Sequence, residues 1–203
     1  MDRAIAVATR LFHQRGYDSV GIAELSKQIG ITPPSLYSAF GNKRSLFETV
    51  LERYVQQNSG WLVAALASSE TLETCIQTLF ERAAETYTSS SECRGCLALD
   101  GSRNCGDEGA KELTAGYRRK TWELIRDRIA AESSATELDE AESVALSDAA
   151  VDTLSDYTLT ILLGLSASAR DGVTTAALKE TGAIAAAGFT QRLRDCRGHK
   201  PKA

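Results

Sequence analysis

The sequence predicts an all-α protein, and three observations support this fold class. Its 203 residues include only three prolines, so helices can run unbroken through most of the chain. Residues with high helix propensity, such as Ala, Leu, Glu and Arg, are plentiful, whereas runs of β-branched residues are scarce. Apolar residues make up 43% of the chain, which is enough for a substantial core. We expect about nine helices.

Four helices are predicted near the N-terminus. Residues 2–16 place apolar side chains at helical spacing and end at a glycine. Two short helices follow at about 22–29 and 33–40, each ending at a glycine. A fourth helix begins near Lys43, where the preceding Asn42 can cap it.

The remaining residues predict five more helices. A strong amphipathic stripe runs from Leu72 to Tyr87, and the glycine-bounded segment around 93–109 is expected to contain a short helix. Three long helices are predicted at the following ranges: 108–131, about 138–169 and 173–196.

Residues 22–40 carry the pattern of a helix-turn-helix, in which a tight glycine turn joins two short helices. Gly30 can adopt the positive φ that such a turn requires. Thr32 is a suitable N-cap, and Pro33 falls on the first helical position, where its missing N–H costs nothing. Pro34 still lies within the first turn, so the two prolines stiffen the start of this helix rather than break it.

The second helix of such a motif enters the major groove of DNA with its first residues at the base edges. The outward-facing positions that could contact bases are Pro34, Ser35, Ser38 and Ala39. The positions suited to holding phosphates are Thr32, Tyr37 and Lys43. A cation at a helix N-terminus is unfavourable by itself, which favours a phosphate role for Lys43.

The segment from "AIAVATRLFHQRGY" through "ITPPSLYSAFGNKRSLFETVLERY" resembles the N-terminal domain of the tetracycline-repressor-like (TetR/AcrR) family of transcriptional regulators. The matching marks include Gly16-Tyr17, Leu36-Tyr37 and Lys43. Family members usually carry Ser or Thr where Gly21 stands, so a hydroxyl contact to phosphate is absent, and the backbone N–H groups that follow are the remaining donors. We therefore expect a DNA-binding domain over residues 1–47 and an effector-binding and dimerisation domain over 48–203.

The resemblance also implies a homodimer that associates through the last two helices. The small residues of this region allow close helix approach, and its apolar residues supply area, although an ordinary intramolecular helix pair would look similar. The expected interface residues are Val151, Leu154, Ile161, Leu162, Leu165, Ile184, Ala185, Gly188 and Phe189.

A small-molecule pocket in the larger domain is the third implication of the resemblance. Its candidate residues are aromatic or polar, and each could equally belong to a plain core or, for the aspartate, cap a helix. They are Phe80, Tyr87, Cys96, Asp100, Tyr117, Trp122 and Tyr157.

Cys93, Cys96 and Cys105 form a cluster that leaves alternatives open. A C-x-x-C pair can ligate zinc or act in redox or electrophile chemistry, and neighbouring arginines could lower a thiol pKa. A tetrahedral metal site needs four ligands, and no histidine lies near in sequence. The alternative without a sensing role is that these thiols are structural or incidental.

Other function classes fit the sequence poorly. No stretch reaches 18 apolar residues and the start is too polar for a secretory signal, so we expect a cytoplasmic protein without a membrane contact. Motifs for nucleotide binding, zinc hydrolysis or a serine nucleophile are absent, and two histidines leave little scope for general base chemistry. A helical interaction module without DNA binding would explain the helices but not the Thr32-to-Lys43 pattern.

The charge distribution agrees with a local nucleic-acid contact. Residues 1–54 carry seven Lys/Arg against five Asp/Glu, a net +2, whereas residues 55–203 carry a net −6. The sequence thus predicts a ligand-responsive repressor, without cofactor or metal, that leaves a near-palindromic operator when an effector binds. A redox- or metal-sensing regulator of the same fold is the alternative.

Overall fold

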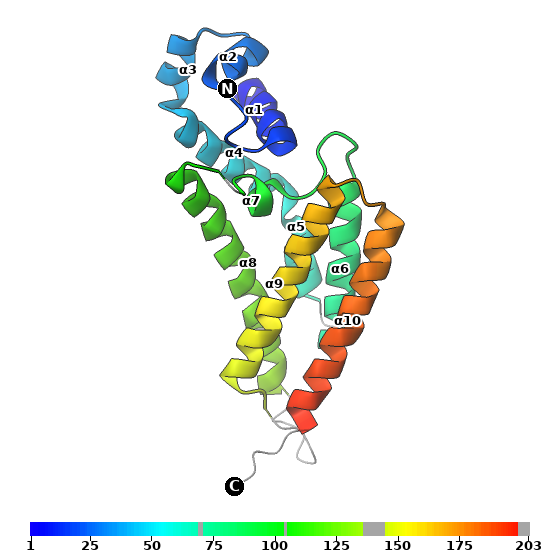
Figure 1. Ribbon diagram of the computed structural model, residues 1–203. Helices are drawn as coiled ribbons and strands as arrows, with labels where there is room; N and C mark the ends of the chain where they lie inside the picture. Colours follow the sequence, from blue (N-terminus) through cyan, green and yellow to red (C-terminus); the bar gives the residue numbers. More distant parts are fainter. Residues whose placement is uncertain (69–70, 104, 136–144, 199–203) are drawn as a thin grey trace.

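The computed structural model describes residues 1–68, 71–103, 105–135 and 145–198, and all regular structure in these ranges is helical (Figure 1). Ten helices occur there: α1 (Asp2–Arg15), α2 (Ile22–Ile29), α3 (Pro33–Phe40), α4 (Lys43–Asn58), α5 (Gly60–Leu66), α6 (Leu72–Thr88), α7 (Leu97–Asp100), α8 (Glu108–Ala135), α9 (Asp148–Arg170) and α10 (Thr175–Gly198). Within the described ranges, none of these helices is long and apolar enough to cross a bilayer. The predicted all-α class is confirmed.

Figure 1 shows α1–α4 gathered at one end of the molecule, which we call the head, and the longer helices running side by side below it, which we call the body. Each part has its own hydrophobic core. Phe12, Phe47 and Leu36 are fully buried in the head core. Phe80 and Phe189 are fully buried in the body core.

Helix α7 and helix α4 join the two parts. Leu97 and Ala98 of α7 are buried in the head core, whereas Leu99 is buried in the body core. Just after α7, the carbonyl of Gly101 accepts a hydrogen bond from the N–H of Tyr17 at 2.8 Å. The segment around α7 therefore packs against both cores, and Ala110 of α8 is also buried in the head core.

The expected domain boundary after residue 47 falls inside α4. This helix continues to Asn58, and its Val50 and Leu51 are fully buried in the head core. A single rigid helix therefore runs from the head into the body.

Two details of the elements differ from the sequence-based expectations. Helix α5 was not expected, and with it the described residues hold ten helices rather than about nine; seven residues without a polar face give no amphipathic signal. The helix expected from about residue 138 starts only at Asp148, because residues 145–147 are not helical and the Ser147 hydroxyl caps α9 by accepting from the Ala150 N–H. Residues 136–144 lie outside the described ranges.

Candidate DNA-binding surface and effector cavity

The turn between α2 and α3 is set by glycine and by buried contacts. Gly30 adopts φ +84°, and its N–H donates to the carbonyl of Ser26 at 2.9 Å. A left-handed conformation of this kind favours glycine. Leu25 and Leu36 are fully buried on the inner sides of the two helices, so the turn presents α3 at a fixed angle.

The first turn of α3 is capped as the sequence predicts. The Thr32 hydroxyl accepts from the Ser35 N–H at 3.4 Å, and Pro33 and Pro34 occupy the first two helical positions. The N–H of Leu36 donates to the Thr32 carbonyl at 3.0 Å, which starts the regular helical bonds. The helix therefore begins at a defined residue with little freedom in its first turn.

The outward face of α3 is open to solvent. Only Leu36 of this helix is buried, and Tyr37 is 48% exposed. The six candidate DNA contacts from Thr32 to Ala39 lie at the start of α3 and along it, and α3 lies at the outer edge of the head (Figure 1). They are Thr32, Pro34, Ser35, Tyr37, Ser38 and Ala39, all exposed. Their role in binding stays a prediction.

Lys43, the seventh candidate, lies at the first position of α4 and is half-buried. Its Nζ sits over the Tyr17 ring, 4.2 Å from the ring centroid. Partial burial lowers the pKa of this ammonium, whereas the carboxylates of Asp18 and Asp107 act in the opposite direction. The Tyr17 hydroxyl donates to Asp107 at 3.0 Å, so the lysine rests on a ring that the body holds in place.

The start of α2 differs from that of α3. Its N-cap is Gly21, which has no side chain to accept from the first amides. The first regular helical bond runs from the Leu25 N–H to the Gly21 carbonyl at 3.0 Å. Among the described residues, the N–H groups of Ile22, Ala23 and Glu24 have no hydrogen-bond acceptor.

A cavity of about 240 Å³ lies where the head meets the body. Its wall is mainly apolar and aromatic, with contributions from α4 to α9. The lining residues are Tyr54, Val55, Asn58, Ser59, Trp61, Leu62, Val63, Thr86, Tyr87, Cys96, Ala98, Leu99, Tyr117, Lys120, Thr121, Leu124 and Leu162. Val63 and Leu124 are both exposed to solvent, so the cavity opens between α5 and α8.

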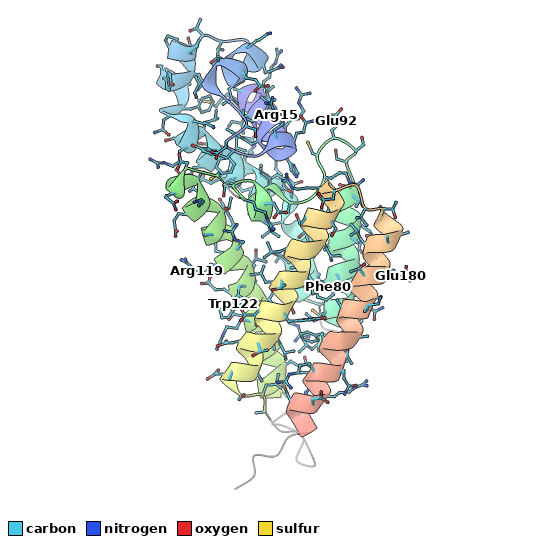
Figure 2. The ribbon with its side chains drawn as sticks, in the orientation of Figure 1. Arg15, Phe80, Glu92, Arg119, Trp122 and Glu180 are labelled. Atoms are coloured by element: carbon cyan, nitrogen blue, oxygen red, sulfur yellow. The ribbon has the colours of Figure 1, made fainter. Side chains whose placement is uncertain are left out.

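Three of the seven candidate pocket residues line this cavity, namely Tyr87, Cys96 and Tyr117. The other four lie elsewhere in the body. Phe80 is fully buried in the core, and Gly182 of α10 packs against it (Figure 2). Trp122 of α8 donates its Nε1–H to Asp156 of α9 at 2.8 Å.

The last two of these four residues make internal hydrogen bonds. The buried Asp100 carboxylate accepts from the Ser166 hydroxyl and pairs with Arg103. The Tyr157 hydroxyl donates to the Ala185 carbonyl at 2.9 Å. Two wall residues that the sequence analysis missed are Tyr54 and Trp61, which no local pattern distinguishes from core aromatics.

The cysteines of the cluster are free thiols, and Cys96 and Cys105 pack against hydrophobic side chains. Burial raises the pKa of Cys96 and also that of Cys93, which is opposite to the shift that activates a reactive thiolate. Among the described residues, no group of three or more His, Cys, Asp and Glu side chains is placed to hold a metal ion. The redox- and metal-sensing alternatives are therefore not favoured.

Most of the predicted dimer-interface residues belong to the core of their own subunit. Six of them are buried against the other body helices and are not available to a partner: Val151, Leu154, Leu162, Leu165, Ala185 and Phe189. Ile161 is half-buried. Ile184 is 70% exposed and Gly188 is also exposed, so the outward face of α10 runs through these two residues.

The head carries a capped, exposed recognition helix in a helix-turn-helix, and it is joined to a larger helical body with a cavity. This arrangement defines the class of DNA-binding transcriptional regulators that carry the DNA-binding and cavity-bearing domains on the same polypeptide. The model of the family "Bacterial regulatory proteins, tetR family" matches residues 4–50. The HTH-type transcriptional repressor BdcR of Escherichia coli (strain K12) is 34% identical over 184 residues, covering 91% of this chain and 86% of that protein. The chain therefore belongs to the TetR family, as its sequence resemblance suggested.

Two further relatives agree. The HTH-type transcriptional repressor ComR of the same strain is 28% identical, covering 95% of this chain and 87% of its own length. A cysteine-substituted form of the TetR family regulator CifR, solved with 26-bp double-strand operator DNA, superposes with a TM-score of 0.79 at 27% identity, covering 91% of this chain and 94% of CifR. The fold, with its head and its body, is therefore that of complete family members.

Proposed function

We propose that this protein is a homodimeric transcriptional repressor that leaves a near-palindromic operator when a small molecule fills the cavity. The observation that carries the proposal is the exposed outer face of α3, held by a capped first turn, on a head like that of an operator-bound relative. Two relatives that span most of the chain are repressors by name, which supports repression over activation.

In this proposal α3 reads the major groove end first. Ser35 and Ser38 offer hydroxyls to base edges, and Pro34 and Ala39 offer small apolar surfaces to thymine methyl groups. Thr32, Tyr37 and Lys43 hold phosphates and so fix the register of the helix.

A second copy of the chain supplies the second reading head, and we propose that α9 and α10 form the interface. Ile184 is a large apolar side chain left in solvent, and the small residues Ala183, Ala187 and Gly188 around it are exposed on the same helix. A surface of this kind lets two helices approach closely. Two-fold symmetry then requires two half-sites on the DNA.

The cavity is placed to couple effector binding to the head. Tyr54 and Asn58 in its wall belong to α4, the helix whose first residue is Lys43. Ala98 in the wall is also buried in the head core. An effector that binds one arrangement of α4 and α7 more tightly shifts the population toward it and changes the spacing of the two heads.

We further propose that the protein regulates and does not catalyse, that it needs no cofactor, and that it works in the cytoplasm, where its DNA target lies. Membership of a regulatory-protein family supports the first point.

The test compares Lys43→Ala with Lys111→Ala, a matched change of a lysine on α8 that pairs with Glu108. DNA selected from a random pool supplies the operator, and fluorescence anisotropy measures affinity between 50 and 200 mM salt. We expect Lys43→Ala to flatten the slope of log K against log[salt] by about 0.9 per subunit, so about 2 for the dimer. The Lys111 variant should keep the wild-type slope, and equal slopes in all three proteins would contradict the phosphate role.

A further inference from the structure

Tyr87 presents an unusual hydroxyl in the wall of the cavity. The residue lies near the end of α6 and is only 3% exposed. Its hydroxyl makes no hydrogen bond with any residue in the described part of the chain, whereas Tyr157 donates to the Ala185 carbonyl and Tyr54 donates to the Cys96 thiol. The oxygen is not among the fully buried side-chain atoms that lack a partner, so it keeps some accessible surface in the cavity that Tyr87 lines and is open to an occupant of that cavity.

The surroundings of Tyr87 are apolar. The Trp61 ring meets the Tyr87 ring edge-on with their centroids 5.9 Å apart, and Leu99 and Leu162 lie in the same wall. The volume of about 240 Å³ is below the ~300–1,000 Å³ usual for ligand pockets, so the occupant is small. A small apolar molecule satisfies this wall, and an oxygen that accepts from Tyr87 satisfies the hydroxyl.

The charges around the cavity favour a neutral occupant. Lys120 is the one cation among the lining residues, and it is exposed. Near the inner wall the buried Asp100 carboxylate pairs with Arg103 and Arg170, so these charges offset one another. Burial raises the pKa of both Tyr87 and Cys96, so these two groups stay neutral. An anion placed beside Tyr87 would lose its hydration without gaining a cation.

We infer that the effector is a small, neutral, mainly apolar molecule with a hydrogen-bond-accepting oxygen, such as a ketone or ester carbonyl, that binds the Tyr87 hydroxyl. The inference rests on the proposed function, since it names the chemistry of the molecule that fills the cavity. Tyr87 is then the residue that distinguishes an oxygenated ligand from a hydrocarbon of the same shape.

The experiment uses three probes that share a phenyl group and a short chain: propiophenone (neutral, with a carbonyl), n-propylbenzene (neutral, without oxygen) and 3-phenylpropanoate (anionic). Calorimetry measures their affinity for the full-length wild type and for Tyr87→Phe, which removes only the hydroxyl. Tyr157→Phe is the matched control, because that hydroxyl bonds outside the cavity wall. Circular dichroism checks that each variant is folded.

We expect Tyr87→Phe to weaken the affinity for propiophenone about tenfold and to change the affinity for n-propylbenzene by less than about twofold. We expect Tyr157→Phe to leave both affinities unchanged. We expect 3-phenylpropanoate to bind at least tenfold more weakly than propiophenone to the wild type. Equal effects of Tyr87→Phe on the ketone and the hydrocarbon would overturn the role of the hydroxyl. An anion that binds as tightly as the ketone would overturn the neutral assignment, and binding of none of the three would overturn the whole inference.

The same probes separate this inference from the proposed function. Propiophenone is added to the complex with selected operator DNA, and release is followed by anisotropy. Binding that depends on Tyr87 but leaves the DNA complex intact supports the inference and contradicts effector-driven release. Release of the DNA by n-propylbenzene and propiophenone alike, unchanged by Tyr87→Phe, supports effector-driven release and contradicts the inference.

Discussion

His13 makes the stability of the head–body junction depend on pH. This residue of α1 is 6% exposed, and its Nε2 lies 3.2 Å from the Gly95 carbonyl of the segment before α7. Burial, together with the nearby Arg170 guanidinium, lowers the pKa of His13 to about 4. The folded protein therefore keeps this imidazole neutral at pH values where an unfolded chain would protonate it.

The size of the effect follows from the two pKa values. The unfolded state binds a proton near pH 6.5, whereas the folded state resists protonation down to about pH 4. Stability is therefore unaffected by His13 above about pH 7 and falls as the pH drops from 6.5 toward 4. At about 1.4 kcal/mol per pKa unit, the loss reaches about 3 kcal/mol, a large fraction of the ~5–15 kcal/mol of a typical domain.

The assay is urea unfolding followed by circular dichroism at several pH values between 7.5 and 4, at one fixed protein concentration. His13→Gln removes the titration and keeps a side-chain N–H for the Gly95 carbonyl. Carboxylates titrate equally in both proteins, so the informative quantity is the difference between their unfolding free energies. Between pH 7 and 4 we expect the wild type to lose about 3 kcal/mol more of its unfolding free energy than His13→Gln loses. A difference between the two proteins that stays constant over this range would refute the reasoning.

Two further predictions concern packing and assembly. Gly95 has φ +79°, and a Cβ there would lie 2.8 Å from both the Ser166 carbonyl oxygen and the Arg170 Cγ, whereas a Cβ on Gly172, at φ +90°, would meet no described atom within 4 Å. We expect Gly95→Ala to cost about 1–3 kcal/mol more than Gly172→Ala in urea unfolding, and equal losses would contradict the close packing. Ile184→Glu should leave the helical circular dichroism unchanged but convert the dimer to a monomer in analytical ultracentrifugation, and an unchanged dimer would place the interface elsewhere.

The head was predictable because its determinants are local. Gly30 sets the turn, and Thr32 with Pro33 sets the start of α3; each acts on residues within one helical turn of itself. The helix bounds 22–29 and 33–40 were confirmed for this reason. A short helix without a polar face, such as α5, lacks such a signal.

The body was less predictable because periodicity shows that a residue is buried but not what covers it. Leu154 and Ile184 look alike in the sequence, yet one is buried in its own subunit and the other is in solvent. The cavity wall likewise joins Tyr54 and Trp61 to Tyr87 from three different helices, a grouping that only tertiary packing creates.

The two prolines of α3 also decide which backbone amides can hold an anion. An ordinary helix start offers several unbonded N–H groups to a phosphate. In α3 the first two positions have no N–H at all, and those of Ser35 and Leu36 are already engaged by Thr32. The first turn of α3 therefore has no free backbone N–H, so in the proposed complex its contacts to phosphate come from side chains. The uncapped start of α2 after Gly21, by contrast, has free N–H groups that could contact phosphate.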